Sequence, residues 1–82
     1  MTVPGTVPDL VVSFRDLDEP RPLAARLIAV AHRHGRGWTA HLPDDGSTEH
    51  VTFDAVVDVV IRKTGVPHLL IVWSGATVKL RR

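Results

Sequence analysis

The sequence predicts a single α+β domain of the split βαβ, or ferredoxin-like, class. This is a two-layer sandwich with the order β-α-β-β-α-β-β, in which the last strand is an extra C-terminal edge strand. Two helix-like segments, 23–34 and 53–64, each stand between strand-like segments. Two turn signals, Asp45-Gly46 and Ser74-Gly75, each separate segments that resemble paired strands. The two halves also echo one another, and both helices are expected to cover one face of the sheet and leave the other open.

The first strand is predicted over 10–14, because LVVSF is short and rich in β-branched residues. A helix is expected next, with Asp16 or Asp18 as its cap and Gly35 as its stop. Its inward positions recur at helical spacing: Leu23, Leu27, Val30, Ala31 and His34.

The next two strands, 37–42 and 48–53, form a predicted hairpin with the turn residues DDGS. Centring the turn on Asp45-Gly46 places His41 directly opposite His50. Side chains alternate along a strand, so the apolar positions form a core face: Trp38, Ala40, Leu42, Val51 and Phe53.

A second helix is predicted from Phe53, with Thr52 as its N-cap and Gly65 as its stop. After it, HLLIVW and ATVKLR form a hairpin around Ser74-Gly75. In this register Leu69, Ile71 and Trp73 pair with Ala76, Val78 and Leu80 on the core face.

The composition indicates one small domain over 9–82, preceded by a flexible arm over 1–8 that contains Pro4, Gly5 and Pro8. There is no cysteine for disulfides or a thiolate metal site. The N-terminal residues do not resemble a signal peptide, and no apolar run approaches a membrane span. We therefore expect a cytoplasmic protein with no membrane partner.

No catalytic or cofactor-binding motif is present, so we expect neither an enzyme nor a cofactor. His41 and His50, if opposed, could share a metal ion, but a structural zinc site needs four ligands. Two hydrated histidines on a polar face are the preferred interpretation, and no metal site is expected.

The predicted function is that of a non-catalytic adaptor module that binds a protein partner or a second copy of itself, as a homodimer. The contact surface is expected to be the open sheet face or an edge strand, because aliphatic residues there are ringed by polar ones. The candidate interaction face is Val11, Ser13, Thr39, His41, His50, Thr52, His68, Leu70, Val72, Thr77, Lys79 and Arg81.

A low-specificity nucleic-acid-binding domain is the alternative. Its phosphate contacts would come from Arg15, Arg36, Lys79, Arg81 and Arg82. RNA-recognition sheets stack bases on exposed aromatic residues. Every aromatic residue of this chain is predicted to point inward, and the net charge of +1 is small, so protein binding is preferred.

Overall fold

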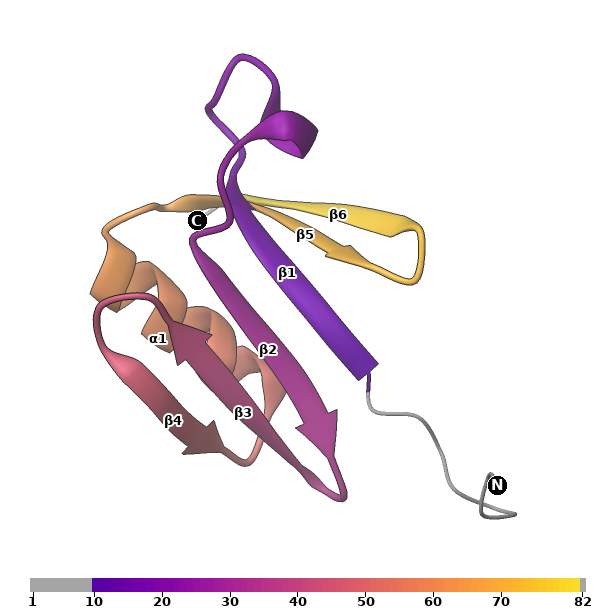
Figure 1. Cartoon of the computed structure of the whole chain (residues 1–82), viewed down its shortest axis with the longest axis vertical. Helices are drawn as coiled ribbons and strands as arrows, with labels where there is room; N and C mark the ends of the chain where they lie inside the picture. The colour runs from indigo at the N-terminus through magenta and orange to yellow at the C-terminus, as the bar shows by residue number, and fades with distance from the viewer. Residues whose placement is uncertain (1–9, 82) are drawn as a thin grey trace.

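One antiparallel sheet of six strands, with a single α-helix against one side, makes up the described part of the chain (Figure 1). The computed structural model describes residues 10–81; the predicted arm 1–8 and Arg82 lie outside this range. The elements in chain order are β1 (Leu10–Asp16), the short 3-10 turn η1 (Pro22–Ala24), β2 (Ala29–His34), β3 (Gly37–Leu42), β4 (Gly46–His50), α1 (Phe53–Thr64), β5 (His68–Trp73) and β6 (Ala76–Arg81).

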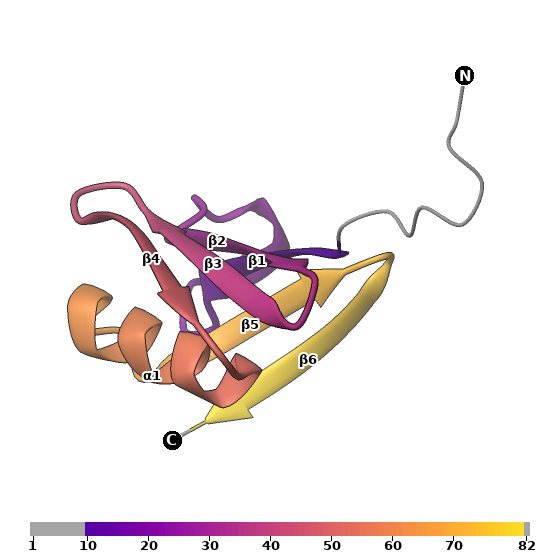
Figure 2. The same cartoon turned by 90° about the horizontal axis from the view of Figure 1, so that it is seen from below.

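The strands are arranged in the order β4-β3-β2-β1-β5-β6. The first four form a meander, in which each strand pairs with the next. The chain then passes through α1 to the other side of β1, where β5 pairs with it and β6 follows as the outer strand. Figure 2 shows α1 on one side of the sheet, with β6 as a free edge. We call the side turned toward α1 the helix side, and the other side the open face.

The ferredoxin-like prediction is wrong, because the segment predicted as the first helix forms β2. Ala29 and Ala31 are buried on the helix side, whereas Val30 and His32 point to the open face. Burial therefore alternates from one residue to the next, as it does along a strand. β2 is hydrogen-bonded to β1 and β3 on its two sides, and this pairing overrides the helix propensity of alanine. Gly35, predicted as a helix stop, instead lies in the β2–β3 turn with a φ of 57°.

The first hairpin has the predicted strand β3 but a different register. Leu42 pairs with Gly46 and Trp38 with His50, so the loop consists of residues 43–45 and is not centred on Asp45-Gly46. The pairing is shifted by three residues, an odd number, so β4 presents the opposite set of side chains to each face. His41 therefore lies opposite Ser47, and the predicted His41–His50 pair does not form. Val51, predicted in the core, is 82% exposed.

The helix 53–64 and the second hairpin are confirmed. The Thr52 hydroxyl accepts the Ala55 N–H at 3.2 Å, as an N-cap does, and Gly65 ends α1 with a φ of 72°. The β5–β6 register agrees with the predicted one, with Trp73 opposite Ala76.

The core lies between α1 and the helix side of the sheet. Its buried members are Val12, Phe14, Ala29, Ala31, Ala40, Leu42, Val56, Val57, Val59, Val60, Leu69 and Ile71. Three alanines on β2 and β3 allow the valines of α1 to approach the sheet closely. Within residues 10–81, neither α1 nor η1 is long and apolar enough to cross a membrane.

Replacing Gly65 by alanine should lower the free energy of unfolding by about 1 kcal/mol, because an L-residue in the left-handed region is strained. A Cβ would meet nothing within 4 Å, so crowding contributes nothing. Gly65→Asn should cost less, since asparagine adopts this conformation more readily. Urea denaturation of the three proteins measures the difference; equal costs for alanine and asparagine would contradict the backbone explanation.

Candidate functional site

The open face contains most of the residues predicted for an interaction surface. The strand registers place Val11, Ser13, Thr39, His41, His68, Leu70, Val72, Thr77, Lys79 and Arg81 on it. Two predicted members are elsewhere: Thr52 caps α1, and His50 lies on the helix side opposite Trp38. The open face also has residues outside the predicted set: His32 and His34 from β2, which had been predicted as a helix, and Ser47 and Glu49 from β4.

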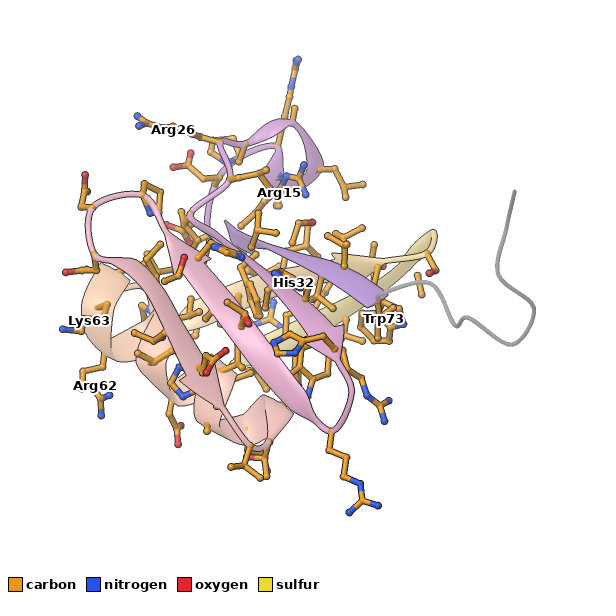
Figure 3. The ribbon with its side chains drawn as sticks, turned by 60° about the horizontal axis from the view of Figure 1, so that its bottom comes forward. Arg15, Arg26, His32, Arg62, Lys63 and Trp73 are labelled. Atoms are coloured by element: carbon orange, nitrogen blue, oxygen red, sulfur yellow. The ribbon has the colours of Figure 1, made fainter. Side chains whose placement is uncertain are left out.

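The β1–β2 connection closes over part of the open face. The Arg15 guanidinium donates from Nε to the Ala25 carbonyl at 3.2 Å and from Nη1 to the Ser13 hydroxyl at 3.1 Å. Leu70 lies directly opposite Arg15 and is only 3% exposed. Figure 3 shows Arg15 close to this connection and Trp73 at the far end of β1. Leu70 is therefore unavailable to a partner, although Val11 remains 56% exposed.

Three histidines, which we call the histidine patch, gather on β2 and β3: His32, His34 and His41. The Nε2 atoms of His32 and His41 are 2.9 Å apart, and their rings stack with centroids 4.9 Å apart at 14°. His41 Nδ1 lies 2.6 Å from the Ser47 hydroxyl oxygen, and His34 Nε2 lies 2.6 Å from the Thr39 hydroxyl oxygen. The alternation within LIAVAHRH, residues 27–34, was the sequence signal for this patch, but the helical spacing of the same residues obscured it.

The remaining predicted histidines have other partners. His68 Nδ1 lies 2.9 Å from the Asp18 carboxylate, forming an ion pair when His68 is protonated. His50 Nε2 lies 2.7 Å from the Thr48 hydroxyl oxygen on β4. Neither joins the histidine patch, and among residues 10–81 no three His, Cys, Asp or Glu side chains lie together as a metal site.

The cations predicted for nucleic-acid binding are divided between two parts of the sheet. Leu70 of β5 lies between Arg15 of β1 and Lys79 of β6, so both cations lie on the same part of the open face. Arg81 follows two residues after Lys79, on the same side of β6. Arg36 lies in the β2–β3 turn, away from the other three.

β6 is an exposed edge with two different sides. Lys79 and Arg81 lie on the open face, whereas Val78 and Leu80 lie on the helix side. Only Leu80 of this strand is partly buried, and Val78 is 40% exposed. α1 contacts β3 and β4, at the other end of the sheet. A free backbone edge, an apolar row and a cationic row therefore occur together on β6.

An apolar hollow of about 200 Å³ lies on the helix side, near the start of β1. Its walls are Leu10, Val12, Trp38, Phe53 and Trp73. The Trp38 and Phe53 rings are in contact, with centroids 4.9 Å apart. Trp73 lies beside Ala76, so the hollow and the apolar row of β6 share one side of the sheet.

The opposite edge, β4, has a different composition. Ser47 and Glu49 point to the open face, and Thr48 and His50 point to the helix side. Neither side of β4 is apolar, and α1 lies close to it. Of the two edges, only β6 combines exposure with an apolar row.

Comparisons of this chain with protein-family models, with curated proteins and with solved structures found no match.

Proposed function

We propose that this domain is a protein-binding module that takes up an extended acidic segment of a partner along the free edge of β6. Pairing with an exposed edge strand is a general mode of peptide recognition, in which backbone hydrogen bonds provide affinity and side chains provide selectivity. The observation that carries the proposal is the division of β6 into an apolar row and a cationic row along one exposed edge.

The backbone of β6 has groups available for such pairing. The β5–β6 loop is Ser74-Gly75, with φ values of 47° and 79°, as in a type I′ turn. In a hairpin of this kind the closing pair exchanges hydrogen bonds, and every second pair after it does the same. Val78 and Leu80 thus bond to β5, and the N–H and C=O groups of Thr77 and Lys79 point outward.

The side chains of β6 define the chemistry of the partner segment. Residues of an added strand alternate between the two faces, as those of β6 do. Positions on the helix side would contact Val78 and Leu80, which favours apolar residues. Positions on the open face would lie beside Lys79 and Arg81, which favours glutamate or aspartate. The preferred segment therefore alternates apolar and acidic residues.

A second copy of the chain is a poorer occupant of this edge. Pairing β6 with β6 of a second copy would bring four cations, two from each chain, along one seam, and like charges in neighbouring strands repel. A lysine on an edge strand also discourages pairing between identical edges. An acidic partner converts the same cations into a source of selectivity.

The test is fluorescence anisotropy with two labelled peptides that alternate valine with glutamate or valine with lysine. The glutamate peptide should bind about 3- to 30-fold more tightly at low salt, because each exposed ion pair contributes up to about 1 kcal/mol. Thr77→Pro should weaken binding of both peptides, since it removes an outward N–H that β5 does not use.

The deciding variant is the double substitution Lys79→Glu and Arg81→Glu, which should reverse the preference toward the lysine peptide. A reversal cannot result from unfolding, which would abolish binding of both peptides. Glu49→Lys, a charge change on the other edge, should leave the preference unchanged. Failure of both peptides to bind, or an unchanged preference in the double variant, would refute the proposal. Displacement of the peptide by single-stranded RNA with a steep salt dependence would favour the nucleic-acid alternative instead.

A further inference from the structure

The two facing imidazoles of the histidine patch have a separation that fits a hydrogen bond and also fits a shared metal ion. The Nε2 atoms of His32 and His41 face one another at 2.9 Å, from neighbouring strands in the middle of a sheet. His32 pairs with Thr39, so His41 is its diagonal neighbour, and the two rings lie nearly parallel. Figure 3 shows His32 over the β2–β3 region of the sheet.

We infer that His32 and His41 form a two-imidazole chelate for a divalent transition metal with tetragonal geometry, copper(II) foremost. Imidazole nitrogens bind such metals at about 2.0–2.1 Å. Two nitrogens that each lie about 2.0–2.1 Å from one ion, at adjacent corners of a square, are about 2.9 Å from each other. The separation of the two Nε2 atoms therefore agrees with a shared metal ion and a nitrogen–metal–nitrogen angle of about 90°. Tetrahedral coordination would separate them by about 3.3 Å.

The neighbouring side chains hold the two rings in place. Ser47 Oγ lies 2.6 Å from Nδ1 of His41, so Nδ1–H donates to this oxygen when Nε2 binds a metal. Such a contact to the second ring nitrogen orients metal-binding histidines in general. The His34 ring packs beside His32, with centroids 5.6 Å apart, while its own Nε2 bonds to Thr39. His34 thus supports His32 without competing for the ion.

The site is open and leaves coordination positions for other ligands. His41 is exposed and His32 is partly exposed, so the ion is reached directly from solvent. Among residues 10–81 no third His, Cys, Asp or Glu completes the set, so water or a ligand from another molecule fills the remaining positions. Affinities for nitrogen ligands rise toward copper in the divalent series, which favours Cu²⁺ over Ni²⁺ and Zn²⁺.

Calorimetric titration of the full chain with Cu²⁺, in a buffer that does not bind the metal, tests the inference. His32→Gln and His41→Gln should each weaken binding of the tightest Cu²⁺ by at least about tenfold, because a second tethered ligand raises affinity by one or more orders of magnitude. His68→Gln is the matched control, since it leaves the same number of histidines, and it should change the affinity by less than about twofold. Ser47→Ala should produce an intermediate loss, through the orientation of His41.

Electron paramagnetic resonance gives a readout that a change in folding would not imitate. The wild-type Cu²⁺ spectrum should show coupling to two imidazole nitrogens, and each single variant should show one. Circular dichroism without metal confirms that the exposed substitutions leave the fold intact. Equal Cu²⁺ affinity in the wild type and the His32→Gln protein, or an equal loss in His68→Gln, would overturn the inference. In that case the two rings form only a hydrogen bond.

Discussion

Phe14→Ala is expected to lower the free energy of unfolding by about 3–5 kcal/mol, the largest loss for a single side chain in this domain. Phe14 is 0% exposed on β1, which lies in the interior of the sheet between β2 and β5. Its neighbours across the strands are Ala29 and Ile71, and its ring stacks on Phe53 with centroids 6.0 Å apart. Small neighbours such as Ala29 cannot fill the cavity left behind.

Urea denaturation followed by the fluorescence of Trp38 and Trp73 measures this loss. A domain of this size has a total stability of only about 5–15 kcal/mol, so much of the variant should unfold at moderate urea. Val11→Ala is the control, because Val11 lies on the same strand and is 56% exposed on the open face. Its cost should remain below about 1 kcal/mol. Similar losses for the two variants would show that the core does not lie on the helix side of β1.

Sequence reasoning succeeded for the elements that are specified by residues close together in the chain. α1 begins at its predicted cap, Thr52, and ends at Gly65, although its valines favour strand conformation. The β5–β6 hairpin has the predicted register because its two-residue loop leaves a single way to pair the strands. Both elements are specified by residues close together in the chain, so neither required knowledge of the strand order.

The segment 23–34 was mispredicted because its alanines are compatible both with helical spacing and with the alternation of a strand. Ala29 and Ala31 fit the inward positions of β2 as well as a helical stripe, and small residues carry little periodic signal. Both leucines assigned to the inward stripe, Leu23 and Leu27, are exposed in the β1–β2 connection. The strand forms because β1 and β3 both pair with it, and this long-range requirement is not visible in any short window of sequence.

The error in β2 also determined which site residues were missed. With 23–34 read as a helix, His32 and His34 fell outside the predicted sheet, and His41 was given a partner that the register does not provide. The placement of Lys79 and Arg81 on the open face agrees with the prediction, because it depends only on the confirmed hairpin. The proposed β6 edge therefore follows from a local prediction, whereas the histidine patch required the strand order.

Ala31→Leu is expected to lower the free energy of unfolding by about 1–3 kcal/mol, as overpacking of a well-filled core does. Ala31 is fully buried on β2 and lies directly opposite Ala40, which is also fully buried. Above this pair of alanines lie the valines of α1, and a leucine would have to displace the helix or strain its own side chain. Urea denaturation measures the loss.

Val30→Leu is the matched control, since it enlarges the side chain on the same strand but points to the open face. Val30 is partly exposed, and its larger side chain has room to move, so the cost should be below about 0.5 kcal/mol. The comparison also tests the structure of the segment directly. In the helix predicted from the sequence, positions 30 and 31 both belonged to the inward stripe, so both substitutions would be costly. In a strand the two positions face opposite sides, and only Ala31→Leu should destabilise the domain, because only that side chain meets α1.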